Sequence, residues 1–110
     1  APFRRMARWD GMFPLFEEWE LEKVLPLLRE ALAYVREQRA DPATSFDVAI
    51  TGVTPGDEPA IATEIVNTYA AEGATWWLEG IAPYRVGLGY EDKWPLEAFH
   101  ERIRQGPPKS

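Results

Sequence analysis

Polar residues that could bind an anion follow a strand-like segment in the middle of the chain. Thr51, Gly52 and Thr54 lie at and after the end of the apolar segment 46–51. Their hydroxyls and amides could hold a phosphate, helped by the positive end of the helix that starts near Asp57. The alternative is an ordinary strand-to-helix turn, because neither of the common glycine-rich phosphate-binding motifs is present.

Glu79 is the candidate catalytic residue, since it ends the predicted strand 75–79 within the apolar segment 73–80. A carboxylate at a strand end could act as a general base. Arg85, in the loop that follows, could meet a phosphate or a substrate carboxylate. The alternatives are a polar strand end, an ion pair between Glu79 and Arg85, or a solvated arginine. Trp76 and Trp77, in the same segment, are expected more often in a core or an interface than against a ligand.

Several other kinds of chemistry are disfavoured by the composition. The single histidine, His100, and the absence of cysteine make a zinc site improbable, and we expect His100 at the surface. The acidic run Glu17–Glu22 is interpreted as a solvated approach to a helix, not a metal cluster. No Ser/His/Asp or Cys/His nucleophile set is present. The net charge of -6 argues against non-specific binding to nucleic acid or anionic membranes.

These residues must be positioned by elements that the hydrophobic periodicity predicts. A short helix over 2–9 precedes three strands that start near residues 12, 46 and 75, each followed by a helical pattern. The first strand, 12–16, is expected at an edge because it contains Pro14. The helix after it should start at 23–25 with Pro26 in its first turn, or else kink at that proline.

The remaining boundaries follow from capping and turn residues. Asp57 is the predicted N-cap of the next helix, and Gly73 should end that helix. Its buried stripe should contain five residues: Ile61, Ala62, Ile65, Val66 and Tyr69. Pro95 should open a last helix with three apolar residues on one face: Leu96, Phe99 and Ile103. A frayed tail is expected over 106–110.

Strands about 30 residues apart and separated by helices are typical of βαβ units. Right-handed crossovers would place all the helices on one face of a parallel sheet if strand order follows chain order. Trp76 and Leu78 would then point to one side of the last strand, and Trp77 and Glu79 to the other. We therefore predict a single α/β domain over 1–110, a partial (β/α) barrel of about three parallel strands with one uncovered sheet face.

The chain resembles the C-terminal third of the luciferase-like, flavin-dependent oxidoreductases. The segments that carry this resemblance are 4–14, 46–57, 69–80 and 95–108. The resemblance implies an eight-stranded (β/α) barrel, FMN or F420 as the cofactor, hydride transfer, and monooxygenation in many members. It also implies that Glu79 could orient a flavin edge. The cofactor-binding residues that it implies are Thr51, Gly52, Thr54, Trp76 and Arg85.

Three functions remain open at this point. The first is a C-terminal segment of such an oxidoreductase that is catalytically incomplete alone. The second is a self-associating structural or interaction module without catalysis, and the third is a small ligand-binding α/β protein. We expect a homo-oligomer formed through the uncovered sheet face. We also expect a cytoplasmic protein, because the sequence has neither a secretory signal pattern nor a long apolar run.

Overall fold

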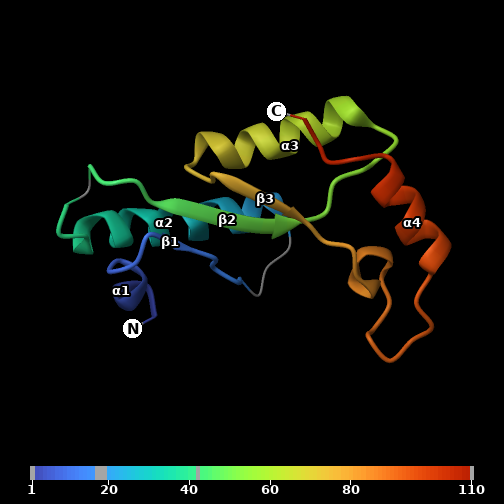
Figure 1. Cartoon of the computed structure of the whole chain (residues 1–110), viewed down its shortest axis with the longest axis horizontal. Helices are drawn as coiled ribbons and strands as arrows, with labels where there is room; N and C mark the ends of the chain where they lie inside the picture. The colour runs from blue at the N-terminus through green and yellow to red at the C-terminus, as the bar shows by residue number, and fades with distance from the viewer. Residues whose placement is uncertain (1, 17–19, 42, 110) are drawn as a thin grey trace.

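A computed structural model of the chain describes residues 2–16, 20–41 and 43–109. Strands and helices alternate along it, as the sequence predicts (Figure 1). The elements are α1 (Pro2–Met6), β1 (Gly11–Met12), α2 (Leu21–Gln38), β2 (Asp47–Gly52), α3 (Pro59–Ala71), β3 (Trp76–Glu79), the 3-10 turn η1 (Pro83–Val86) and α4 (Leu96–Arg104). The strands form one parallel sheet in the order β1-β2-β3, so strand order follows chain order.

One face of this sheet is covered by helices and the other is open. Ala49 of β2 pairs with Trp76 of β3, and Ile50 pairs with Trp77, so the side chains alternate between the faces. Trp77 packs on the helix side, whereas Trp76 is 61% exposed. In Figure 1, α2 lies behind β2, and no described helix crosses in front of the strands. The predicted alternation and the predicted uncovered face are both confirmed.

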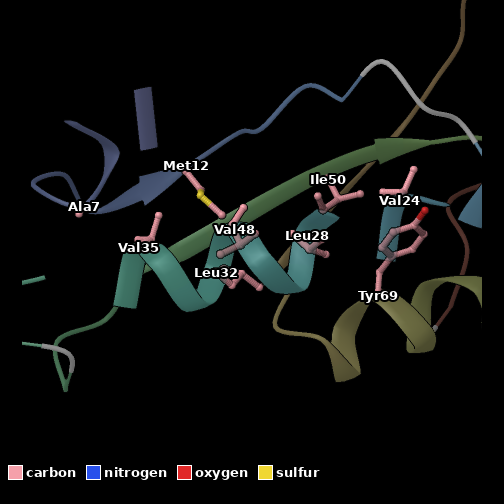
Figure 2. Close-up of a cluster of buried hydrophobic side chains, with 10 residues drawn as sticks. Ala7, Met12, Val24, Leu28, Leu32, Val35, Val48, Ile50 and Tyr69 are labelled. Carbon is pink, nitrogen blue, oxygen red and sulfur yellow. The ribbon is translucent and has the colours of Figure 1, made fainter. Parts of the chain in front are cut away.

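The core lies between α2 and the covered face of the sheet (Figure 2). Apolar residues at helical spacing form the buried stripe of α2: Val24, Leu28, Ala31, Leu32 and Val35. They pack with Val48 and Ile50 of β2 and with Tyr69 of α3. Helical periodicity in α2 and strand alternation in β2 therefore meet in one apolar cluster.

The predicted start of α2 is wrong, because the helix begins at Leu21 and Pro26 lies inside it. Proline removes the backbone donor that would bond the carbonyl of Glu22. Glu22 and Pro26 are both exposed, so water can solvate that carbonyl and the helix tolerates the proline. Glu20 and Glu22 are solvated, as expected, while residues 17–19 of the acidic run lie outside the described part of the chain.

The predicted N-cap of α3 is also wrong, because Glu58 takes this position and makes no side-chain capping bond. Pro59 is the first helical residue, so one of the amides that a cap would satisfy does not exist. Gly73 follows the end of α3 with a positive φ of 116°, as a terminating glycine should. Ile61, predicted in the buried stripe of α3, is exposed.

Two further predictions fail at the ends of the chain. The predicted strand 12–16 pairs only at Gly11–Met12, because Pro14 cannot donate to a ladder. In α4 the buried face carries Phe99 and Arg102, whereas Leu96 and Ile103, predicted beside Phe99, are exposed. The helix is thus rotated so that an arginine, and not an isoleucine, faces inward.

The position of the core predicts a contrast between two neighbouring leucines of α2. Leu28 is completely buried and Leu27 is exposed. Leu28→Ala should lower the free energy of unfolding by about 3 kcal/mol, because it leaves a cavity. Leu27→Ala, the control, should cost well under half as much. Urea unfolding followed by tryptophan fluorescence measures both, and equal losses would contradict this location of the core.

Candidate functional site

Glu79, at the end of β3, lies at the centre of a polar cluster. Its Oε2 accepts hydrogen bonds from the Thr54 amide at 2.8 Å and from Arg85 Nη1 at 2.5 Å. Its Oε1 accepts from Thr54 Oγ1 at 2.5 Å and Trp77 Nε1 at 3.0 Å, and lies 3.3 Å from Arg102 Nη2. We call Thr54, Trp77, Glu79, Arg85 and Arg102 the Glu79 cluster.

The two arginines of this cluster also converge on Thr54, whose side chain is completely buried. Arg85 Nη2 donates to the Thr54 carbonyl at 2.6 Å. Arg102 donates to the same carbonyl at 3.2 Å and to Thr54 Oγ1 at 2.9 Å. Arg102 Nη1 also donates to the carbonyl of Gly106 at 2.6 Å. The cluster therefore joins the segment after β2 to β3, η1, α4 and the start of the tail.

The environment of Glu79 keeps its carboxylate ionised. Burial raises its pKa, whereas the hydrogen bonds from Thr54, Arg85 and Trp77 lower it. The combined effect of the hydrogen bonds is larger than that of burial, so the pKa lies below its ordinary value. The ion pair with Arg85, one of the alternatives for Glu79, is present in the structure. A base needs a free lone pair, and Glu79 would first have to lose some of these donors. Its catalytic role stays a prediction.

Two glycines allow the chain to close around this cluster. A Cβ at Gly52 would collide with the Trp77 ring. A Cβ at Gly80 would collide with the Tyr84 hydroxyl. Glycine at both positions lets the end of β2 and the segment after β3 approach the aromatic side chains closely.

A cleft of about 650 Å³ adjoins the Glu79 cluster. It opens at the carboxyl ends of the strands, between the covered face of the sheet and the helices α2 and α3, which is where parallel α/β proteins often bind ligands. Its described lining is mostly apolar: Pro14, Leu15, Phe16, Leu21, Val24, Ile50, Thr51, Gly52, Val53, Ile65, Tyr69, Trp77, Tyr84 and Arg85. The volume suits a small organic molecule.

The structure brings some of the predicted site residues together and separates others. Thr54, Glu79 and Arg85 meet in the Glu79 cluster. Thr51 and Gly52 line the cleft, and Thr51 Oγ1 also donates to the Leu78 carbonyl at 3.0 Å, which ties β2 to β3. The remaining predicted residue, Trp76, lies on the open face of the sheet, away from the cluster. His100 is exposed, as expected.

Sequence reasoning missed two residues of this region, Arg102 and Tyr69. Arg102 follows Phe99 by three residues and so shares its helix face, which was the available signal for a buried arginine. Tyr69 was predicted to be buried in the stripe of α3, but nothing in its spacing indicated that it lines a cleft. The tail described over 106–109 returns toward α3 (Figure 1), where Pro108 lies near Val66 and Trp76. Fraying of 106–110 stays a prediction.

Fold and site together define a parallel α/β chain with a buried Glu–Arg cluster and an adjoining cleft at the carboxyl edge of its sheet. The described residues contain no group of three or more His, Cys, Asp or Glu arranged to hold a metal ion. No helix of the described ranges is long and apolar enough to cross a membrane. No protein-family model, curated protein or solved structure matches the chain.

The Glu79 cluster predicts that the protein is destabilised when the negative charge of Glu79 is removed, and that the size of this effect depends on pH. Glu79→Gln should lower the free energy of unfolding by about 3 kcal/mol at neutral pH, because the buried Arg102 and the partly buried Arg85 lose their anion. The folded-state pKa is lowered, so this contribution is complete above the unfolded-state pKa. This contribution to stability is lost as the pH falls through the folded-state pKa of Glu79. The difference between wild type and Glu79→Gln should therefore shrink in acid.

Glu72→Gln is the matched control for this measurement. Glu72 also pairs with one arginine, Arg29, but that arginine is well exposed. An exposed pair contributes little, so Glu72→Gln should have a much smaller effect than Glu79→Gln. Urea unfolding over a pH series measures both variants. Similar losses for the two, or a Glu79→Gln effect that does not change with pH, would contradict the stabilising role of the Glu79 carboxylate.

Proposed function

We propose that this chain is the C-terminal segment of a luciferase-like, flavin-dependent (β/α) barrel. The observation that supports this most is the sheet, in which three parallel strands follow chain order and carry helices on one face only. Consecutive strand–helix units of a barrel have this arrangement, with the helices outside and the other sheet face inside. In the proposal the open face carrying Trp76 and Leu78 is the barrel interior.

The proposed flavin, FMN or F420, lies on the open side of the sheet. Trp76 is 61% exposed there and offers an aromatic surface to an isoalloxazine ring. The flavin supplies the hydride-transfer chemistry when bound. The chain supplies one wall of the site, and the Glu79 cluster holds the segments after β2 and β3 in place. In this proposal the chain alone is catalytically incomplete.

Flavin binding tests the proposal. The chain is titrated with FMN and with F420, and binding is followed by quenching of flavin and tryptophan fluorescence. One of the two cofactors should bind, and Trp76→Ala should weaken that binding about fivefold, because a stacking contact contributes about 1 kcal/mol. Trp9→Ala is the control, since Trp9 is equally open to solvent but precedes β1. No binding, or equal affinities for the two variants, would contradict the proposal.

A second candidate function, a self-associating module without catalysis, is favoured by the open face itself. Two apolar side chains of β3, Trp76 and Leu78, are exposed on this face. Contiguous exposed apolar surface commonly marks an interface. The edge of β3 also has no neighbouring strand in the described part of the chain. In this reading a second copy of the chain covers the open face.

Sedimentation measurements separate this candidate from the first. The wild-type chain should be a dimer or larger at micromolar concentration. Leu78→Glu should weaken association about tenfold or more, because it places an unpaired carboxylate in the interface. Leu88→Glu is the control, since Leu88 has nearly the same exposure but lies in the loop after η1. A monomeric wild type, or identical behaviour of the two variants, would contradict self-association through this face.

A further inference from the structure

Tyr69 places a polar group without a partner inside an apolar cleft. Its side chain is 5% exposed, and its hydroxyl makes no hydrogen bond within residues 2–16, 20–41 and 43–109. Figure 2 shows this hydroxyl directed away from α3, toward Val24 of α2, and both residues line the cleft. Burial raises the Tyr69 pKa, so the phenol stays protonated and can donate. This hydroxyl is not enclosed by protein atoms, so it is free to donate to a molecule that enters the cleft.

Arg85 gives the same cleft a positive charge. It is the one charged side chain among the described residues that line the cleft. Three of its N–H groups donate to Glu79, to the Gly80 carbonyl and to the Thr54 carbonyl. Because a guanidinium has five N–H donors, two of them remain. Within the Glu79 cluster, two guanidinium groups also face a single carboxylate, so the cluster carries an excess positive charge.

Most of the other described residues that line the cleft are apolar. Phe16, Leu21, Ile50, Ile65 and Trp77 line the cleft, and the ring centroid of Trp77 lies 5.5 Å from that of Tyr69. A volume of about 650 Å³ accommodates an aromatic ring with a short chain. Apolar walls, one unpartnered hydroxyl and one positive charge together select a ligand that is apolar along most of its length and carries a single negative charge.

We propose that this cleft binds a small apolar carboxylate, an aromatic or medium-chain acid, whose charge is held by Arg85 and which accepts a hydrogen bond from Tyr69. The ligand lies on the helix-covered side of the sheet, whereas the proposed flavin faces Trp76 on the open side. This inference therefore goes beyond the proposed function and needs neither flavin nor self-association.

Calorimetric titration of the full chain with phenylbutyrate tests the inference. Phenylbutyrate should bind at one site per chain. Its neutral amide, phenylbutyramide, has the same apolar body and should bind at least about tenfold more weakly, because it lacks the charge that Arg85 would pair. No binding of phenylbutyrate at millimolar concentration, or equal binding of acid and amide, would overturn the inference.

Variants of α3 locate the site. Tyr69→Phe keeps the ring beside Trp77 and removes only the hydroxyl, so it should weaken phenylbutyrate binding about tenfold. Ile65→Trp should abolish binding by filling the cleft. Ile61→Trp is its matched control, since Ile61 lies one turn away on α3, is exposed and does not line the cleft. Urea midpoints check that each variant folds.

Each result of this series decides for or against the inference. Unchanged affinity in Tyr69→Phe, or equal affinity in the two tryptophan variants, would overturn it. The variant Trp76→Ala distinguishes binding in the cleft from binding of the proposed flavin. It should bind phenylbutyrate as the wild type does, even where it no longer binds flavin, and a parallel loss of both would overturn the assignment to the covered side of the sheet.

Discussion

The arrangement at the carboxyl edge of the sheet depends on one partly buried carboxylate, that of Glu79. Glu79 accepts hydrogen bonds from the amide and hydroxyl of Thr54 and forms ion pairs with Arg85 and Arg102. An arginine that is removed from water needs such a partner, because an uncompensated buried charge is costly. Apolar packing fixes α2 against the sheet, whereas ion pairs with this carboxylate link η1 and α4 to the end of β3.

The two faces of the sheet differ in how well they are packed. The side that faces α2 and α3 is packed with apolar side chains and ends in a cleft with two polar groups, Tyr69 and Arg85. The other side exposes Trp76 and Leu78 to solvent. An apolar sheet face that is open to water is stabilised when something covers it, and the barrel and the self-association hypotheses propose different covers.

Local patterns predicted the sheet well because its residues follow simple periodicities. Alternation predicted that Trp76 and Trp77 lie on opposite faces but not which face is covered, and the wide helical stripe of α2 marked the core. Three errors lie at prolines (Pro14, Pro26 and Pro59), whereas at α4 a long-range contact outweighed the local pattern. Arg102 turned α4 away from the predicted apolar face, although it lies 48 residues from its partner Thr54. The Glu79–Arg85 pair was foreseeable because only five residues separate the two, whereas the cleft could not be foreseen without the packing of α2, α3 and β2.

The long sequence separation between Arg102 and Thr54 also affects the order in which the chain can fold during synthesis. Thr54, Glu79 and Arg85 leave the ribosome before Arg102, which comes from the last helix. Strands and helices up to β3 can therefore pack first, as elements of growing chains generally do. The Glu79 cluster is complete only after α4 has been made. The segments that contribute Thr54, Glu79 and Arg85 therefore gain the contacts of Arg102 late in synthesis.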